Sequence, residues 1–469
     1  MSSRVGTSRA IDNPGVAADP EDAAGDVPEP PRSLYIHVPF CVSICPYCDF
    51  AVVAGAAARG PRNRIKPFID ALRQEIELRS RDGPGFRAGD GPGFRAGDGA
   101  QLAGSQLGGS QLAGSRLGGS RLGAGLEPSR PPLDTIYFGG GTPSLLPAED
   151  IAGLIELVRA RYGIADGAEI TLEANPGPDE RGDADALRHA GVTRISYGAQ
   201  AFDDAELRRL GRRHRVQDIE AAVRAARDAG IQSVNLDLLY DTPGQSLEGF
   251  EAGLAAALAL KPDHLSLYAL TLDDPDAEGL TGPTGDHLPT TRGARAWRTR
   301  ARSAQDEDRA ASMYEHAVGR MAAAGFDGYE ISNWARPGHH GRHNLAYWMR
   351  RPHEAVGPGA HAFDGWTRRW NAARLDGYVA ALTPHDGSAS HVPPGGEDPI
   401  DASTARAEAV ILGLRLSRGI PASAGERPPL AEHVTWAFDA GILERASGSR
   451  LILTTHGRLV SNELFSRLV

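Results

Sequence analysis

Short apolar runs alternate with amphipathic stretches of helical spacing between residues 34 and 270, and this alternation constrains the fold more than any other feature. It predicts an α/β fold with a parallel sheet whose strands are joined by right-handed helical crossovers. The periodicity fits a doubly wound sheet and an incomplete barrel equally well. In either architecture, ligands gather at the carboxyl ends of the strands. The predicted strands are 34–38, 135–138, 169–173, 194–198, 234–238 and 264–270, and the predicted helices are 65–79, 148–161, 183–189, 216–229 and 247–258.

The pattern changes after residue 308. A predicted helix at 310–323 and a strand-like run at 328–331 precede a His- and Trp-rich segment at 334–370. The last part of the chain reads as a helix at 404–416, a second helix at 430–440, an apolar run at 451–454 and a final helix ending at residue 469. This order predicts a small C-terminal α+β domain that resembles a winged helix. The predicted domains are therefore 32–307, 308–400 and 401–469, after a tail of residues 1–31.

Two stretches inside the first domain are predicted to be insertions. Residues 81–126 hold two copies of DGPGFRAG followed by Leu-containing pentads such as QLAGS and RLGGS. One Leu in five residues buries too little apolar surface to offset the entropy of ordering, which predicts a flexible linker. The polar stretch 272–305 is rich in Asp, Thr, Gly and Arg and predicts a second surface excursion.

The charge balance excludes some partners. The chain has 50 Lys and Arg against 60 Asp and Glu, a formal net charge of −10, which argues against a binder of nucleic acid or of anionic membranes. No run approaches the ~20 apolar residues that a membrane span needs. Residues 1–31 are polar and acidic and lack the apolar core of a secretory signal, so they predict a disordered tail and a cytoplasmic protein.

All three cysteines, Cys41, Cys45 and Cys48, fall within eight residues, on a loop that leaves the first predicted strand. This layout does not suit a disulfide framework. Three thiolates at this spacing can hold one face of a four-iron cluster, which leaves one iron open to the amino and carboxylate groups of a methionine derivative. The alternatives are a zinc site, which usually has a fourth ligand, and three unrelated buried thiols.

The motif Cys41-x3-Cys45-x2-Cys48, with Tyr47 before the last cysteine, resembles the signature of the radical S-adenosylmethionine superfamily. The wider sequence is similar to the oxygen-independent coproporphyrinogen III oxidases, and most similar to their relatives the HemW-type heme chaperones, over nearly the whole chain outside the tail and the insertions. The resemblance implies a partial (β/α)6 barrel carrying a [4Fe-4S] cluster and S-adenosylmethionine. In the superfamily, one-electron reduction of the cluster cleaves that cofactor to a 5′-deoxyadenosyl radical.

Further motifs extend the resemblance to the cofactor site. Residues 139–143 read Gly-Gly-Gly-Thr-Pro after the second strand, where glycines let the backbone approach a ligand closely. They resemble the segment that contacts the amino end of S-adenosylmethionine in the family. Polar residues at or just past strand ends match other family positions, although each alone fits a surface or capping residue. The implied contacts are Tyr35, Tyr47, Gly140, Gly141, Thr142, Glu173, Gln200, Arg212, Asp237 and, from the short match Tyr268-Ala269, Ala269.

Two features bear on function within the family. The oxidases resembled here have a fourth cysteine two positions after the third, where this chain has Phe50. Residues 342–348, RHNLAYW, resemble the HNxxYW motif of the heme chaperones, and an imidazole can ligate heme iron. A structural histidine with core aromatics is the alternative. Five of the 15 histidines lie within 339–361, which supports a metal or heme role; the heme candidates are His343, Tyr347 and Trp348, and a predicted turn at 357–361 carries His361 near the site.

The preferred interpretation is a heme chaperone on a radical S-adenosylmethionine scaffold, rather than an enzyme. It would pass heme to an acceptor protein such as a respiratory cytochrome. The resemblance also implies an electron donor for the cluster and is compatible with a homodimer and with peripheral contact to membrane proteins. The alternatives are an oxidase that decarboxylates coproporphyrinogen III, against which Phe50 argues, and an unrelated radical enzyme or methyltransferase, which would not explain the HNxxYW match.

Overall fold

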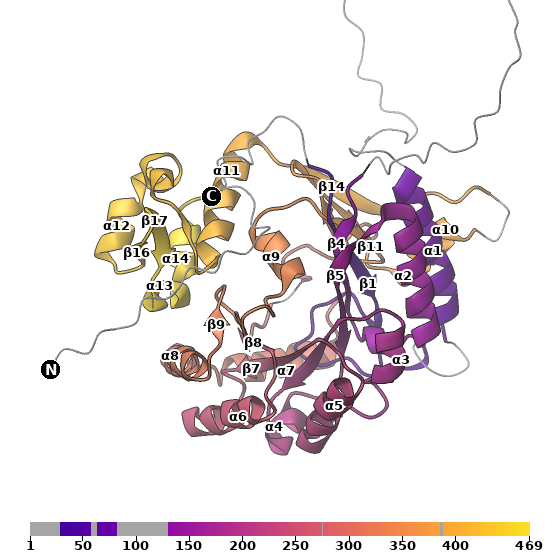
Figure 1. Ribbon diagram of the computed structural model, residues 1–469, viewed down its shortest axis with the longest axis horizontal. Coiled ribbons are helices and arrows are strands. Elements are labelled where there is room, and N and C mark those ends of the chain that lie inside the picture. The colour runs from indigo at the N-terminus through magenta and orange to yellow at the C-terminus, as the bar shows by residue number, and fades with distance from the viewer. Residues whose placement is uncertain (1–28, 58–62, 82–129, 274, 385–387) are drawn as a thin grey trace, which may run out of the picture.

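The computed structural model describes residues 29–57, 63–81, 130–273, 275–384 and 388–469 (Figure 1). Its main sheet has nine strands in the order β11-β1-β4-β5-β6-β7-β8-β10-β9. The strands from β11 to β8 are parallel, and β10 and β9 continue the sheet antiparallel. In sheet order the bounds are Glu354–Val356, Ser33–Val38, Leu133–Gly140, Ile164–Ala174, Arg194–Gln200, Ser233–Tyr240, His264–Ala269, Asn333–Ala335 and Asp327–Gly328.

The six predicted strands and five predicted helices of the first domain are confirmed, with ends that shift by a few residues. Helix α4 (Asp204–Arg209) was not predicted. The helices that follow β1, β4, β5, β6 and β7 cover the outer face of the curved sheet (Figure 1). They are α1 (Ile65–Arg81), α2 (Ala148–Tyr162), α3 (Ala184–His189), α4 (Asp204–Arg209), α5 (Val216–Asp228) and α6 (Leu247–Ala259).

Side-chain alternation along the parallel strands divides an apolar outer face from a polar inner face. On β1, Leu34, Ile36 and Val38 are fully buried in the apolar core that the strands share with α1 and its neighbours. The alternate residues Tyr35 and His37 point the other way, because successive side chains in a strand lie on opposite faces. Their counterparts on the next strands form the polar inner face: Thr135, Tyr137, Glu173, Ser196, Asn235, Asp237, His264 and Ser266.

The region after the barrel strands differs from the prediction in one place. Residues 328–331 were predicted to form a strand, but 329–332 form the connection between β9 and β10. The Glu330 carboxylate is fully buried there and accepts a hydrogen bond from the Asn333 side chain, which closes the turn. The other described elements here are α8 (Glu307–Ala323), α9 (Arg342–Trp348), β12 (His361–Phe363), β13 (Thr367–Asn371), α10 (Leu375–Leu382) and β14 (Gly395–Pro399).

The C-terminal part has its own three-stranded sheet, β15-β17-β16, and its own apolar cluster (Figure 1). Two predicted helices are each divided in two: 430–440 bends at His433, and the last helix bends at Val460 and ends at Phe465. The elements are α11 (Ala402–Arg415), β15 (Ile420–Pro421), η4 (Ala422–Glu426), η5 (Leu430–Glu432), α12 (Val434–Asp439), β16 (Leu443–Ala446), β17 (Arg450–Leu453), α13 (Thr455–Leu459) and α14 (Ser461–Phe465).

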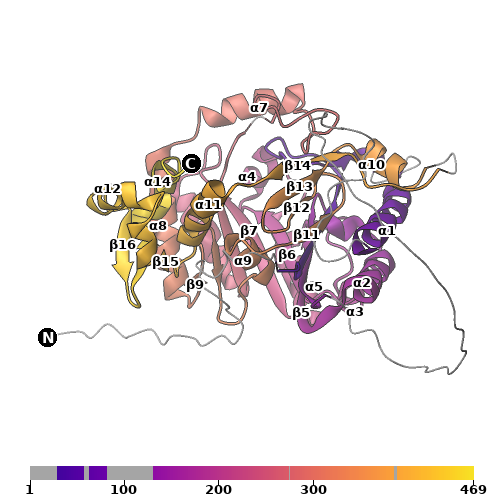
Figure 2. The ribbon, with the colours of Figure 1, turned by 90° about the horizontal axis from the view of Figure 1, so that it is seen from above.

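The two predicted insertions have different outcomes. Residues 82–129, which contain the repeats, and residues 1–28 of the tail lie outside the described residues. The stretch 272–305 is more than a surface excursion, because it contains the helix α7 (Arg292–Arg302), which Figure 2 shows lying along one side of the barrel. Within the described ranges, no helix is both long enough and apolar enough to cross a bilayer.

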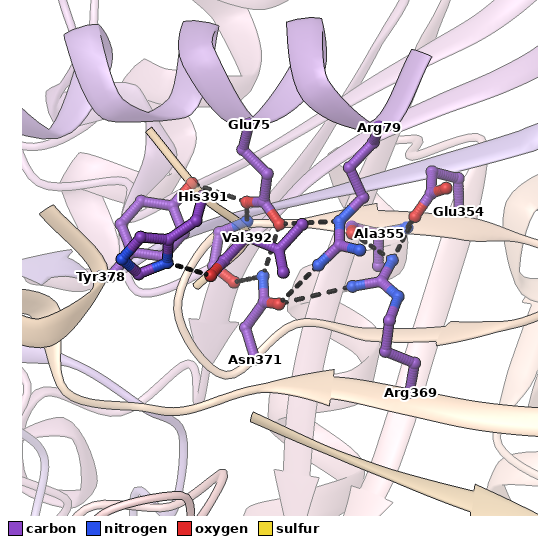
Figure 3. A network of polar contacts seen from close by, with 10 residues as sticks. Glu75, Arg79, Glu354, Ala355, Arg369, Asn371, Tyr378, His391 and Val392 are labelled. Carbon is purple, nitrogen blue, oxygen red and sulfur yellow. Dashed lines mark hydrogen bonds and ion pairs between the residues drawn. The ribbon is translucent and has the colours of Figure 1, made fainter. Parts of the chain in front are cut away.

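A buried polar network joins α1 to the segment that follows β11 (Figure 3). The Glu75 carboxylate is completely buried and accepts hydrogen bonds from the Gly357 N–H at 2.9 Å, the Tyr378 hydroxyl at 2.7 Å, Asn371 Nδ2 at 2.8 Å and Arg79 Nε at 3.1 Å. A buried carboxylate is tolerated when its oxygens are paired in this way. The network fixes residues 354–378 against the helix that follows the cysteine loop.

Candidate functional site

The cysteine loop leaves the carboxyl end of β1 and is held by a small parallel pair, β2 (Phe40–Cys41) and β3 (Val53–Ala54). All three cysteines are free thiols and half-buried. Burial, helped by the neighbouring thiols, raises the pKa of Cys41 to about 11 and that of Cys48 to about 12. These two thiols are therefore protonated at neutral pH. A bound metal centre would be needed to stabilise them as thiolates.

A chain of hydrogen bonds connects Cys41 to Cys45 across three strand ends. The Thr142 hydroxyl donates to Cys41 Sγ at 3.6 Å and accepts from Asn175 Nδ2 at 3.0 Å. Arg212 donates to Asn175 Oδ1, to the Gly198 carbonyl at 2.8 Å and to Cys45 Sγ at 3.5 Å. The guanidinium is thus aimed at the thiols, where it can stabilise negative charge. Among the described residues, no three His, Cys, Asp or Glu side chains lie close enough to bind one metal ion together.

The glycine run packs directly against His37 and Phe40, at the start of the cysteine loop. A Cβ on Gly141 would lie 2.5 Å from the Phe40 carbonyl oxygen, and a Cβ on Gly140 would lie 2.5 Å from the His37 ring. Gly140 also has a φ of +107°, a conformation that L side chains rarely adopt. Its N–H donates to Glu173 Oε2 at 3.0 Å. Glycine is therefore needed at these positions to bring the end of β4 beside the cysteine loop. The bare backbone there can also be approached closely by a ligand.

Glu173 and Asp237 are the acidic groups of the inner face. Glu173 accepts from the Tyr137 hydroxyl at 2.7 Å, and burial raises its pKa to about 7. Asp237 accepts from Ser196 at 2.9 Å and from Asn235 at 2.7 Å, and burial also raises its pKa. Burial therefore makes both carboxyl groups easier to protonate than in water, and each keeps a hydrogen-bonding role that polar ligand groups can share.

The other predicted cofactor contacts are spread around the same strand ends. The Tyr35 hydroxyl bonds to His37 Nδ1 at 3.1 Å, and its ring stacks on Tyr137. Gln200 ends β6 with a φ of +66°, and Ala269 ends β8 and is exposed. Arg212 does not follow a strand end as predicted; it follows α4 and reaches back to the ends of β5 and β6.

Two residues that fix the cysteine loop were missed by the sequence reasoning. Asn175 follows β5 directly, a position that could have marked it. Arg298 gave no such signal, because it lies on α7 in the polar stretch. Its guanidinium is buried and donates to the Pro46 carbonyl at 3.2 Å, to the Cys48 carbonyl at 2.9 Å and to the Asp273 carbonyl. Arg298 therefore holds the cysteine loop in place from outside the barrel.

His343 lies in the first turn of the helix α9, which lies against the inner face of the sheet (Figure 1). Its ring is buried and stacks on Tyr137, with the centroids 5.1 Å apart. Nδ1 bonds to Thr135 Oγ1 at 2.7 Å, and Nε2 bonds to the Tyr347 hydroxyl at 2.8 Å. Burial lowers the pKa of His343 to about 3, so the ring is neutral. A heme iron could bind this histidine only after one of the two hydrogen bonds breaks.

Trp348, the last residue of the predicted heme motif, contacts the C-terminal part of the chain. The Arg415 guanidinium of α11 lies 4.3 Å above its ring. This cation–π contact joins α9 to the C-terminal part. Tyr347 packs edge-on against both His343 and His353, which keeps it inside the barrel. The motif is thus divided between two environments, and its three predicted residues do not converge on one surface.

Comparisons with known proteins bear on this arrangement. A family model described as the Radical SAM superfamily matches residues 126–255. The heme chaperone HemW of Mycobacterium tuberculosis (strain CDC 1551 / Oshkosh) is 33% identical over 457 residues, which cover 96% of this chain and 98% of the relative. The chain belongs to the HemW heme chaperone family. HemW of Escherichia coli (strain K12) is 34% identical over 332 residues, covering 71% of this chain and 70% of the relative.

Membership of the HemW family confirms the resemblance read from the cysteine loop and the HNxxYW segment. The solved structure of the radical SAM enzyme coproporphyrinogen III oxidase (HemN) from Escherichia coli matches with a TM-score of 0.68 at 21% identity, covering 95% of this chain and 92% of that one. The α/β fold with its parallel sheet is therefore the HemN-like fold of the superfamily.

The raised pKa of Glu173 predicts a pH dependence of stability. Between the ordinary glutamate pKa of about 4.3 and about 7, the folded protein binds more protons at this site than the unfolded chain, so the site lowers stability as pH rises. As the pH rises through this window, we expect Glu173→Gln to become more stable than the native chain. The difference in free energy of unfolding should reach on the order of 1 to 3 kcal/mol and stay constant above pH 7. Urea unfolding at several pH values measures the difference. Parallel curves for the two proteins would contradict the assignment.

Proposed function

We propose that this protein binds heme and transfers it to an acceptor protein, and that it carries a [4Fe-4S] cluster and S-adenosylmethionine at the cysteine loop. The observation that carries the proposal is the match to the heme chaperone HemW over 96% of the chain. Phe50 supports it, because it stands where the resembling oxidases have a further cysteine. The acceptor is proposed to be a heme protein such as a respiratory cytochrome.

Cys41, Cys45 and Cys48 would hold three irons of the cluster. The hydrogen-bond chain through Thr142, Asn175 and Arg212 would keep the loop in place and place positive charge beside the sulfurs. When bound, the cluster supplies one-electron chemistry and an open iron site. We propose a cytoplasmic protein that receives this electron from a separate donor.

The strand ends beside the loop fit S-adenosylmethionine by their chemistry. The tight backbone of Gly140 and Gly141 leaves room for close approach, and Arg212 can pair with a carboxylate. Glu173 and Asp237 can accept hydrogen bonds from ribose hydroxyls or the amino group. The remaining proposed contacts are Tyr35, Tyr47, Thr142, Gln200 and Ala269.

The test uses the full chain with an anaerobically reconstituted cluster and a chemical reductant. One sample is titrated with heme and followed by optical spectroscopy, and a second receives S-adenosylmethionine and coproporphyrinogen III. Stoichiometric heme binding without decarboxylation, followed by transfer of the heme to an apo-cytochrome, is the expected result. Formation of protoporphyrinogen would contradict it and favour the oxidase. Failure to bind heme would overturn the proposal directly.

We also expect the repeats to be dispensable for the cluster. Deleting residues 81–126 removes Gly- and Ser-rich pentads with little apolar surface, and shortening a long connection costs little entropy. The deletion variant should reconstitute the same iron and sulfide per chain as the native protein. Iron and sulfide assays with the visible absorption of the cluster measure this. Loss of the cluster in a folded deletion variant would show that the repeats contribute to the site.

A further inference from the structure

Two neighbouring segments concentrate positive charge beside the cysteine loop. The helix α7, residues 292–302, holds five arginines and no acidic residue, in a chain whose formal net charge is −10. Residues 208–215, from the end of α4 to the start of α5, hold five more arginines and again no acidic residue. The chain uses arginine in place of lysine throughout, but that preference does not explain why both segments lack Asp and Glu.

The two basic segments are in contact with each other. The Trp297 indole of α7 donates a hydrogen bond to the Arg209 carbonyl at 3.1 Å. The Trp297 ring also packs against Tyr47 of the cysteine loop, with the ring centroids 6.2 Å apart. The positive charge of both segments therefore gathers on one side of the barrel, the side along which α7 lies (Figure 2).

Both segments also touch the cysteine loop from outside. Arg298 of α7 donates to the Pro46 carbonyl at 3.2 Å and to the Cys48 carbonyl at 2.9 Å. A Cβ on Gly211 would lie 2.8 Å from Cδ of Pro46, so the connection between α4 and α5 passes directly against the same part of the loop. The two basic segments therefore cover the outside of the loop that would hold the cluster.

Most arginines of this surface are exposed and available to a partner. On α7, Arg295 is matched by Asp276, and acidic residues follow at 306–308, at the start of α8. Among the residues that the structure describes, six exposed arginines of the two segments form no ion pair. These six, which we call the basic face, are Arg208, Arg209, Arg213, Arg215, Arg292 and Arg300.

The cysteine loop adds exposed apolar residues next to the part that α7 contacts. Ile44 lies two residues before Pro46, and Phe50 lies two residues after Cys48. The two residues are 46% and 60% exposed. Aromatic residues and arginine are enriched in protein–protein interfaces, and charged residues are commoner at the rim than at the centre. Exposed apolar residues with arginines around them are therefore typical of a surface that another protein contacts.

We propose that the basic face, together with Ile44 and Phe50, docks a small acidic protein that carries one electron and reduces the cluster. The inference rests on the proposed function, because it names the class of donor that this function needs. One electron passes from the carrier to the cluster, so the carrier is oxidised by one electron and the cluster is reduced by one. No bond forms or breaks.

The position of the basic face favours a carrier over other anionic partners. A nucleic acid or an anionic membrane also attracts positive charge, but neither has a reason to lie over the loop that would hold the cluster. Complementary charge speeds encounter without requiring a large buried area, and redox complexes bury small interfaces. Such a contact suits a carrier that must leave after each electron.

The experiment measures the binding of flavodoxin, an acidic flavin-containing carrier, to the full chain without a cluster. It then measures the rate at which reduced flavodoxin reduces the reconstituted cluster. Arg208→Glu/Arg300→Glu reverses one charge on each basic segment. Arg224→Glu/Arg320→Glu is the matched control, because it makes the same change in net charge at exposed arginines of α5 and α8. We expect the first variant to bind and be reduced at least about tenfold more weakly and slowly at low ionic strength, and the control to behave as the native protein. The difference should shrink at high salt.

Reduction by methyl viologen separates docking from damage to the cluster. This small reductant does not need a docking surface, so neither variant should be reduced more slowly than the native protein. If the native chain assembles a cluster and Arg208→Glu/Arg300→Glu binds flavodoxin and accepts its electron as the native chain does, the inference is wrong and the proposed function stands. Phosphatidylglycerol vesicles that bind the native chain and not this variant, with flavodoxin binding unchanged, would assign the face to a membrane and overturn the inference. If the native chain assembles no cluster, the proposed function fails in its cofactor, and the inference fails with it.

Discussion

Cys45→Ala is expected to abolish cluster assembly while heme binding stays within about a factor of ten of the native value, which is about 1.4 kcal/mol. The thiol is one of only three in the chain, and it is the one that Arg212 faces at 3.5 Å. Nothing else in the loop can replace it as a soft ligand. The heme candidates His343 and Tyr347 lie on α9 instead, so loss of one thiol leaves them in place.

The measurement combines iron and sulfide content after anaerobic reconstitution with a heme titration of the same preparation. Ser43→Ala is the control, because it alters a neighbouring side chain of the same loop and keeps all three thiols. A Cys45→Ala protein that still assembles a full cluster would contradict the ligand assignment. Equal loss of heme binding in a folded variant would contradict the separation of the two sites.

Glu75→Ala is expected to destabilise the protein by about 3 to 5 kcal/mol, the cost of removing one partner from a buried ion pair. The change would leave the Arg79 guanidinium, only 10% exposed, without its carboxylate. It would also remove the acceptor for the Gly357 N–H, the Tyr378 hydroxyl and the Asn371 amide. Chemical denaturation gives the loss in unfolding free energy, and hydrogen exchange should show its largest increase in residues 354–378.

Asp70→Ala is the matched control, because it removes a carboxylate from the same helix at an exposed position. Asp70 pairs with Lys66 at 3.2 Å, but the two side chains are 49% and 85% exposed. An exposed pair at this spacing contributes about 0.3 to 0.5 kcal/mol. A similar effect for both substitutions would show that the network in Figure 3 does not hold the segment after β11 to the barrel.

The barrel strands and their helices were predictable because their signal is local. Leu34, Ile36 and Val38 alternate with polar residues, and this period of two is readable in any short window. The turn at 329–332 was wrongly predicted as part of a strand, because its apolar residues resemble a short strand pattern. The buried pairing of Glu330 with Asn333 decides the structure there, and it leaves no periodic pattern.

The candidate site was predictable only where a contiguous motif carried it. The cysteines and the glycine run are contiguous in sequence and were found. Arg298 acts on the cysteine loop from at least 250 residues away, within a stretch whose composition indicates only exposure. Its partners are backbone carbonyls, and such long-range contacts have no sequence period. The burial of His343 likewise depends on packing between α9 and β4, which no local pattern shows.

The strand β1 leads into the cysteine loop, and its pairing determines when both of its edges are covered during synthesis. Leu34 pairs on one side with Ile136 and on the other with Glu354, so its second neighbour is made more than 300 residues later. At ribosomal rates of about 5 to 20 residues per second, that interval lasts roughly 15 to 60 seconds. Throughout it, the strand that leads into the three thiols has an open edge. The last third of the chain closes this edge, so a nascent protein presents its cysteines on an unfinished sheet.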